Sequence, residues 1–345
     1  MEPRIAWNDL PGPLKQAIRA RTGPITGVRI ASAGQNSPLA ATIDAESGTV
    51  FVKGMPSGHR QVVTQAREAA VAPLVKSISP ALLWHFDEAG WNVLGYEHAP
   101  GRHADYTPGS PDLDQLVHLM DALSTINAPD NPGPLKRAED RWKPYVHDPE
   151  TASVFAGAAL THSDWTPDNV LVSPSRAWLI DWAWPTLGAA WTDPACWILR
   201  LMASGGHTAR QAEQQASRLP AFQAADPAHI DLFAAANVRL WDEITQTSTS
   251  TWTNDMARAA HVWLAYRQAR LRPANDGTTC PWRPQVFQGF PYTSILPFDP
   301  TLPNALSHQF RVSASASNRA QPARSHASSL TCLWMVDSGR AMRYC

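Results

Sequence analysis

The segment from residue 160 to residue 182 constrains the fold of this chain more than any other part of the sequence. It contains two short apolar runs, Asn-Val-Leu-Val and Trp-Leu-Ile, separated by a Ser-Pro-Ser turn, a pattern typical of a β-hairpin. Asp164 precedes the first run, Asn169 begins it, and Asp181 directly follows the second. Because a hairpin brings its open ends together, we expect these three polar side chains to meet.

Two carboxylates and a carboxamide in one place suit a hard cation such as Mg²⁺, with one carboxylate left to act as a base. Phosphoryl transfer needs such a set, because its transition state spreads charge over phosphate oxygens and its nucleophile must be oriented. The spacing of His162, Asp164, Asn169 and Asp181 is that of a kinase catalytic loop followed by a metal-binding aspartate. Each residue taken alone is as easily explained as a turn residue, so the prediction rests on their combination.

In detail, this segment resembles the aminoglycoside phosphotransferase and choline kinase-like family. In that family the loop runs His-Gly-Asp, and the later motif is Ile-Asp-Trp or Ile-Asp-Phe. Here residues 162–164 read His-Ser-Asp and residues 180–182 read Ile-Asp-Trp. Ser163 replaces the usual glycine, and Asp168 replaces the usual small residue before the asparagine. Neither change removes a ligand, and the resemblance covers roughly residues 25–270.

The resemblance implies an α+β protein kinase-like fold of two lobes. Residues 1–98 are expected to form the N-lobe, an antiparallel sheet of about five strands with one helix near 59–72. Residues 99–272 are expected to form an α-rich C-lobe with the catalytic loop and the acceptor site. Residues 273–345, rich in Pro, Ser and Ala, are predicted to be largely disordered. Apolar periodicity places C-lobe helices from residue 112 and at about 150–160, 194–204, 207–218, 227–246 and 252–271.

The N-lobe offers candidate nucleotide-binding residues. In the kinase pattern a lysine such as Lys53, at the end of a strand, contacts the α- and β-phosphates and pairs with a helix glutamate, here Glu68. Solvated helix residues are the alternative. The loop around Gly34 would let backbone N–H groups approach phosphates, although it lacks G-x-G-x-x-G and could be an ordinary hairpin loop. The resemblance implies that adenine binds backbone groups in the connection that begins at Glu97.

These residues predict an ATP-dependent phosphotransferase that moves the γ-phosphate to a hydroxyl of a small molecule. Asp164 would orient that hydroxyl and take its proton, while Asn169 and Asp181 would hold Mg²⁺. Lys53, held by Glu68, would contact the phosphates of ATP, and GTP in place of ATP is left open. A non-catalytic nucleotide-binding module of pseudokinase type is the alternative, favoured by the poor glycine loop. A metal-dependent hydrolase would need clustered histidines, which do not accompany these aspartates.

The acceptor is less constrained by the sequence. Cationic acceptors would need an acidic or aromatic-lined pocket. The C-lobe offers four acidic and three aromatic candidates for such a pocket: Asp193, Asp242, Glu243, Asp255, Trp184, Trp241 and Trp252. A solvated helix face and core tryptophans explain these residues equally well. Asp193, in a Gly-x-x-x-x-Asp-Pro stretch similar to one in the family, is expected to cap a helix or to accept bonds from the catalytic-loop backbone.

Charge, apolar runs and cysteine spacing argue against several other classes of protein. A formal net charge of −1 gives no electrostatic reason to expect nucleic acid or an anionic membrane as partner. No apolar run approaches the length of about 18 residues that a membrane span needs, and the N-terminus lacks the pattern of a signal peptide. The four cysteines lie far apart, which argues against a disulfide framework or structural zinc. We therefore expect a cytoplasmic protein with no obligate protein partner.

Overall fold

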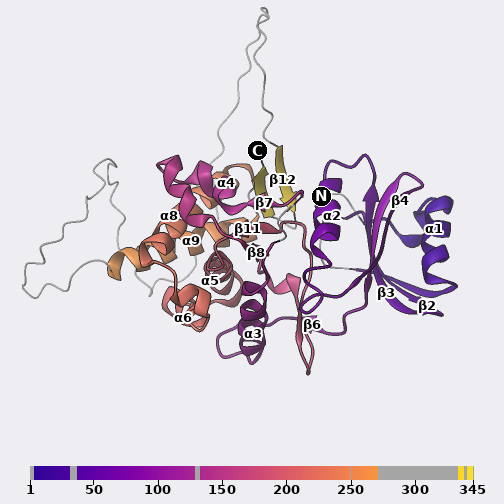
Figure 1. The fold of residues 1–345 in the computed structure, drawn as a ribbon, viewed down its shortest axis with the longest axis horizontal. Coiled ribbons are helices and arrows are strands. Elements are labelled where there is room, and N and C mark those ends of the chain that lie inside the picture. The colour runs from indigo at the N-terminus through magenta and orange to yellow at the C-terminus, as the bar shows by residue number, and fades with distance from the viewer. Residues whose placement is uncertain are drawn as a thin grey trace, which may run out of the picture. The chain divides into compact units, whose positions relative to one another are not determined.

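The computed structural model describes most of the chain, as residues 4–31, 37–128, 133–248, 250–270, 333–337 and 340–344. Its contacts group Met1–Arg272 with Cys332–Cys345 as one compact unit. The other unit, Pro273–Thr331, lies outside the described residues, as does most of the predicted disordered extension. Within the described part, an antiparallel sheet comes first in the sequence and a helical region follows it (Figure 1). These are the N-lobe and the C-lobe below.

The N-lobe is a five-stranded antiparallel sheet in the order β1-β2-β3-β5-β4. Its strands are β1 (Ile25–Ile30), β2 (Leu39–Ala45), β3 (Gly48–Pro56), β4 (Leu82–Glu88) and β5 (Trp91–Glu97). A strand points successive side chains to opposite faces, and β2 and β3 use both. Leu39, Ala41 and Ile43 join Val50 and Val52 in an apolar core. The residues between them in sequence therefore face the other way, toward the cleft described below.

Two main helices accompany this sheet. Helix α1 (Gly12–Thr22) covers the apolar face with Leu14 and Ile18, both fully buried. Helix α2 (Val62–Val71) begins three residues later than predicted, because the chain first makes turns in which the amide of Val62 donates to the carbonyl of His59. Helix α2 carries Glu68 on a buried face.

The C-lobe is built from helices whose apolar stripes form one large core. They are α3 (Asp112–Ser124), α4 (Ala138–Trp142), α5 (Thr192–Gly205), α6 (Ala209–Ala216), α7 (Pro220–Gln223), α8 (Pro227–Thr247) and α9 (Thr251–Arg270). Five of the predicted helices are present within a few residues of their expected bounds. Asp226 caps α8 by accepting from the amide of Ala228, as its position before a proline suggests. Among the described residues, no helix combines the length and the apolar character needed to cross a membrane.

Short strands connect these helices. β9 (Val170–Val172) and β10 (Ala177–Leu179) form the predicted hairpin, and β6 (Arg102–His103) pairs with β9. β11 (Thr186–Gly188) pairs with β7 (Lys136–Arg137) and β8 (Ala159–Thr161). Two further strands, β12 (Leu333–Asp337) and β13 (Arg340–Tyr344), pair within the extension.

The helix predicted at about 150–160 is wrong. A 3-10 helix covers Pro149–Phe155, and the chain then extends into β8. A Cβ on Gly157 would lie 2.3 Å from the carbonyl oxygen of Gly188, so the backbone of this segment packs directly against β11. Pairing with a strand that is distant in sequence thus overrides the local helical pattern.

Gly95 of β5 makes a testable close contact in the N-lobe sheet. A Cβ there would lie 2.2 Å from Cε2 of Trp84, whose ring stacks on Phe86 at 5.7 Å. Gly95→Ala should destabilise the protein by about 1–3 kcal/mol, as overpacking does. In a Trp84→Ala background the same change should cost much less, because alanine is otherwise the better strand residue. Denaturant unfolding of the four proteins measures this, and additive effects would contradict the contact.

Candidate active site

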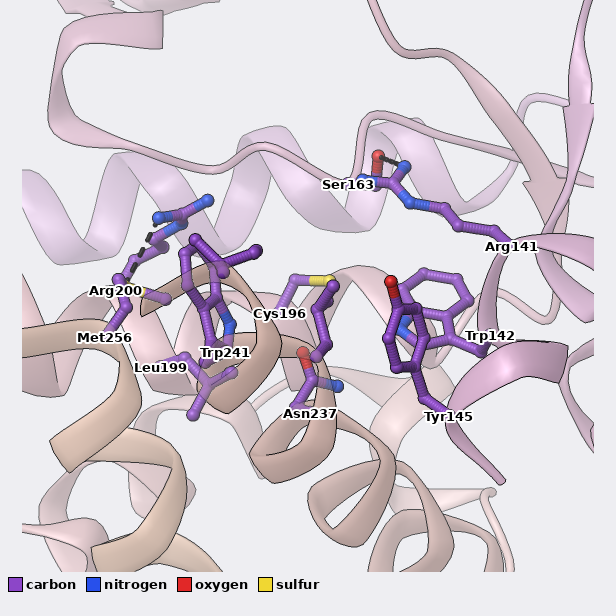
Figure 2. A pocket seen from close by; sticks show the side chains of 12 residues that line it. Arg141, Trp142, Tyr145, Ser163, Cys196, Leu199, Arg200, Asn237, Trp241 and Met256 are labelled. Carbon is purple, nitrogen blue, oxygen red and sulfur yellow. Dashed lines mark hydrogen bonds between the residues drawn. The ribbon is translucent and has the colours of Figure 1, made fainter. Parts of the chain in front are cut away.

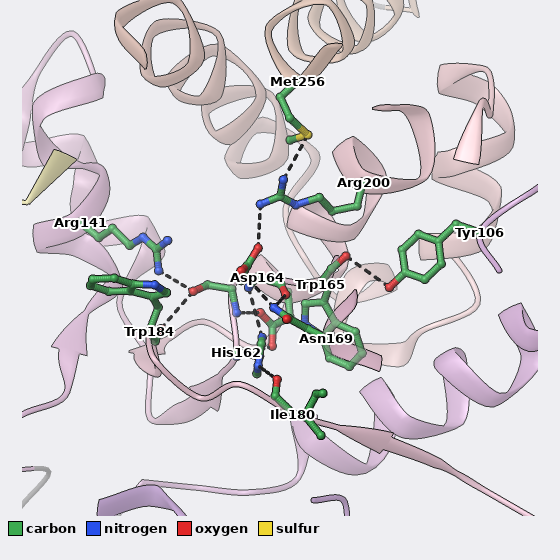
Figure 3. A network of polar contacts seen from close by, with 12 residues as sticks. Tyr106, Arg141, His162, Asp164, Trp165, Asn169, Ile180, Trp184, Arg200 and Met256 are labelled. Carbon is green, nitrogen blue, oxygen red and sulfur yellow. Dashed lines mark hydrogen bonds and ion pairs between the residues drawn. The ribbon is translucent and has the colours of Figure 1, made fainter. Parts of the chain in front are cut away.

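Asp164 and Asn169 are locked together in the loop between β8 and β9 (Figure 3). The side-chain amide of Asn169 donates to Oδ2 of Asp164 at 3.0 Å and to its carbonyl oxygen at 2.9 Å. Arg200 of α5 donates from Nη2 to the other carboxylate oxygen, Oδ1, at 2.9 Å. All three side chains are at least 90% buried. The side-chain nitrogen of Asn169 points to Asp164. The side-chain oxygen of Asn169, Oδ1, is therefore the atom that could bind a metal ion or accept a hydrogen bond.

The hairpin brings Asp181 to the same place, as the sequence predicted. The amide of Ile180 donates to the carbonyl of Asn169 at 2.9 Å, so the pairing of β9 with β10 continues to the residue before Asp181. Asp181 itself has a φ of 63°, a left-handed conformation that aspartate tolerates better than most residues. Such backbone strain is common at functional sites.

Lys53 connects the two lobes. Its Nζ lies 2.7 Å from Oε1 of Glu68 and 2.7 Å from Oδ1 of Asp181. The hydroxyl of Tyr96 donates to Oε2 of Glu68 at 3.2 Å. The predicted pair of Lys53 with Glu68 is therefore present and buried, and the half-buried Asp181 completes a triad.

Within this triad, the opposite charges favour the ionised forms of Lys53 and Glu68. Burial alone would lower the pKa of Lys53, but the carboxylates of Asp181 and Glu68 outweigh it and hold that pKa above its usual value. Burial raises the pKa of Glu68, and the ammonium of Lys53 opposes that rise. Lys53 therefore stays a cation at ordinary pH, able to bind an anionic group such as a phosphate.

Asp193 fixes the backbone of the catalytic loop by hydrogen bonds. Its two carboxylate oxygens accept from the backbone amides of His162, at 2.9 Å, and Ser163, at 2.7 Å. Burial raises the pKa of Asp193, and these two N–H groups oppose the rise. Nε2 of His162 lies 3.0 Å from the carbonyl oxygen of Ile180, and its ring contacts Trp182 edge-on. Asp193 thus accepts bonds from the catalytic-loop backbone, one of the two roles expected from the sequence, and His162 also holds this loop.

Ser163 stands where the family has glycine, and its backbone explains that preference. Its φ is 62°, in the left-handed region that glycine enters without strain. Its hydroxyl donates to the carbonyl of Trp184 at 3.2 Å and accepts from Nη1 of Arg141. Arg141 also donates to Oγ1 of Thr186 at 3.1 Å. The serine therefore gains a hydrogen bond from Arg141, but it adopts a backbone conformation that glycine would adopt with less strain.

A cavity of about 310 Å³ lies beside Lys53 and is lined from both lobes. Ala40 and Phe51 of the sheet, and Leu171 and Leu179 of the hairpin, give it apolar walls. Its polar lining includes Lys53, Glu68, Glu97, Asn169 and Asp181. Its size and its mostly apolar lining with a few convergent polar groups are those of a small-molecule site. The Gly34 loop, the remaining predicted nucleotide contact, lies outside the described residues.

Three of the four carboxylates suggested for a cationic acceptor are engaged with other groups of the protein. Asp193 is engaged with the catalytic loop, Asp242 lies 2.8 Å from Nε2 of His261, and Asp255 lies 2.7 Å from Nη2 of Arg258. Trp241 and Trp252 pack near the guanidinium of Arg200, and Trp241 lines a cavity together with it. Neither Arg200 nor Arg141 was predicted from the sequence. In the described part of the chain, no group of three or more His, Cys, Asp or Glu side chains could hold a metal ion.

Solved structures show what this architecture is similar to. Choline kinase LicA from Streptococcus pneumoniae matches with a TM-score of 0.53 and 15% identity, over 73% of this chain and 99% of its own. Aminoglycoside phosphotransferase APH(4)-Ia matches with a TM-score of 0.51 and 14% identity, over 74% of this chain and 98% of its own. LicA has been solved in complex with AMP, and a thermostable APH(4)-Ia mutant with AMP-PNP and hygromycin B. The chain matches no family model and no curated protein.

The chain has the protein kinase-like fold. Both matched proteins are covered along nearly their whole length, so the likeness includes the sheet and the helical region. The fold class predicted from the sequence is thereby confirmed, as is the resemblance to aminoglycoside phosphotransferases and choline kinases at the level of fold. Within this kinase-like fold, the activity has to be argued from the site itself.

The support from Asp193 can be tested by removing its oxygens. Asp193→Ala should destabilise the protein by about 2–5 kcal/mol, because two buried N–H groups lose a charged acceptor. Asp193→Asn keeps one acceptor oxygen and should cost less. Asp114→Asn, which changes an exposed carboxylate of α3, is the matched control. Urea unfolding measures all three, and an Asp193→Ala protein as stable as the control would contradict this role.

Proposed function

We propose that this protein is an ATP-dependent phosphotransferase that moves the γ-phosphate to a hydroxyl of a small molecule. The observation that carries the proposal is the triad in which Lys53 lies 2.7 Å from both Glu68 and Asp181 at the wall of a cavity shared by the lobes. A buried cation in such a cavity suits the phosphates of a nucleotide. The AMP and AMP-PNP complexes of the similar proteins support the same choice of ligand.

The nucleotide occupies the cavity beside Lys53. Its base lies between the apolar walls, near the connection that begins at Glu97. Lys53 contacts the α- and β-phosphates, and Glu68 holds its ammonium in place. Tyr96 in turn fixes Glu68 through the bond from its hydroxyl.

Mg²⁺ fits the donor set at the mouth of the hairpin. Oδ1 of Asn169 and the carboxylate of Asp181 are hard oxygen donors, and Mg²⁺ is commonly held by one or two such groups together with phosphates and water. The ion supplies neutralisation of the phosphate charge during transfer.

Asp164 orients the acceptor hydroxyl and takes its proton as the new bond to phosphorus forms. Asn169 and Arg200 each bind one of its oxygens, which fixes the plane of the carboxylate. A carboxylate oxygen carries two lone pairs, so it can accept a hydroxyl in addition to a bond of this kind. His162 and Asp193 hold the loop and do not touch the reacting atoms.

A non-catalytic nucleotide-binding module is the second candidate. The ion pair of Asp164 with buried Arg200 favours it, because this contact ties the carboxylate to the C-lobe core. In that case wild-type protein would bind Mg·ATP and phosphorylate no hydroxyl compound.

Asp164→Asn separates transfer from nucleotide binding. We expect phosphorylation of any accepted hydroxyl compound to fall by about 10²–10⁴-fold, the usual worth of a general base. Mg·ATP binding should be retained, since Lys53 and Asp181 are unchanged. Phosphorus NMR of a mixture of hydroxyl compounds with ATP measures transfer, and calorimetry measures binding.

Asp114→Asn serves as the control for loss of one carboxylate. If Asp164→Asn kept most of the wild-type rate, the assignment of Asp164 would be wrong. Loss of nucleotide binding together with transfer would show that Asp164 acts on the nucleotide instead.

A further inference from the structure

A second cavity lies within the C-lobe, between the catalytic loop and helices α5, α8 and α9 (Figure 2). Among the twelve described residues that line it, two are arginines, Arg141 and Arg200, and none carries a carboxylate. Its uncharged polar lining includes Ser163, Cys196 and Asn237. Burial raises the pKa of the Cys196 thiol to about 12, so this group stays neutral. The charged side chains in this lining are therefore both cationic, although Arg200 is also paired with Asp164.

Arg200 joins this cavity to the catalytic carboxylate. It is 97% buried, and its Nη2 lies 2.9 Å from Oδ1 of Asp164. Its guanidinium lies 4.8 Å from the ring centre of Trp252 and 5.5 Å from that of Trp241. A group bound beside Arg200 would consequently be close to the base that receives the acceptor proton.

Arg141 approaches the same cavity from another element. It is half-buried, and it donates to the hydroxyls of Ser163 and Thr186. Serine at this left-handed position, with a φ of 62°, is strained relative to glycine. The hydroxyl of this strained serine accepts a hydrogen bond from Arg141. The strained backbone therefore occurs at the residue that orients the Arg141 guanidinium.

We propose that this cavity binds a small oxyanionic group of the acceptor, so that the substrates are hydroxyl compounds bearing an anion and not amino alcohols. The inference rests on the proposed function and names its substrate class. Charge-assisted bonds from guanidinium to an oxyanion are strong and directional, whereas an ammonium group would meet like charge in a buried place. The free space of about 40 Å³ holds roughly three waters, which is close to the size of a carboxylate.

Phosphoryl transfer to such an acceptor forms one bond to phosphorus and breaks another. The oxygen of the acceptor hydroxyl forms a bond to the γ-phosphorus, and the bond from that phosphorus to the β-phosphate bridging oxygen breaks. The hydroxyl proton goes to Asp164, and the products are ADP and a phosphomonoester that keeps its original anionic group.

The first test uses glycolate, its neutral amide glycolamide, and the cationic ethanolamine as probes. Ligand-observed NMR should detect glycolate binding to the wild-type protein, and weaker or absent binding of the other two. Arg141→Gln should weaken glycolate binding by roughly 10- to 100-fold, as expected for loss of a charge-assisted bond. Arg258→Gln, which changes a 74% exposed side chain, should leave it unchanged. Ethanolamine binding as strong as that of glycolate would overturn the proposal, as would absence of glycolate binding.

Ser163→Gly is the second variant, in case Arg141→Gln does not fold. Glycine suits the φ of 62° and removes only the hydroxyl that accepts from Arg141, so glycolate binding should weaken in a stable protein. Glycolate binding unchanged in both folded variants would contradict a role for Arg141.

Calorimetry with Mg·ATP on the same samples separates this inference from the proposed function. Wild-type protein and Arg141→Gln should bind Mg·ATP equally, because Arg141 does not line the nucleotide cavity. Loss of Mg·ATP binding to wild-type protein would refute the phosphotransferase, whatever the glycolate result. With Mg·ATP present, hydroxy acids should be phosphorylated in preference to amino alcohols, and the reverse preference would overturn the anionic acceptor.

Discussion

The buried ammonium of Lys53 is the interaction on which the arrangement of this protein depends. A cation removed from water needs opposite charges close by, and here one comes from α2 of the N-lobe and the other from the end of the catalytic hairpin. The hydroxyl of Ser79, in the segment after α2, strengthens the connection by donating to the carbonyl of Leu179 at 2.7 Å. The indole of Trp182 donates to the same hydroxyl at 2.8 Å. The elements that carry Glu68 and Asp181 are therefore tied together at two places, by Lys53 and by Ser79.

A second buried cation organises the other half of the site. Asp164 contacts Arg200 of α5, which lines the C-lobe cavity, and Asn169, which lines the cavity beside Lys53. Asp193, at the start of the same helix, accepts from the amides of the two residues before Asp164. Helix α5 thus sets both the position of the catalytic loop and the charge of the surface that an acceptor would meet. The two arginines that line this cavity are the basis of the proposal of an anionic acceptor.

The sequence predicted the parts of this site that are encoded locally. The hairpin and its polar ends follow from apolar runs around a turn, and the spacing of Lys53 and Glu68 from a strand followed by a helix. The contact of Arg200 with Asp164 joins residues 36 positions apart, and no periodic pattern marks such a contact. The helix expected at 150–160 failed for a related reason, because pairing of β8 with β11 outweighs local propensity. Ser163 was noticed as a departure from glycine, but its bond to Arg141 required three-dimensional placement.

The most direct test of the account is calorimetric titration of Mg·ATP into wild-type protein and Asp181→Ala, with Asp114→Asn as control. The substitution removes the oxygen 2.7 Å from Nζ of Lys53 and one of the two proposed magnesium donors. We expect magnesium-dependent binding to wild type and to the control. Binding to Asp181→Ala should be weaker by at least about tenfold, the loss expected for a charged contact. Equal affinity of Asp181→Ala and wild type for Mg·ATP, or no nucleotide binding to folded wild-type protein, would contradict it.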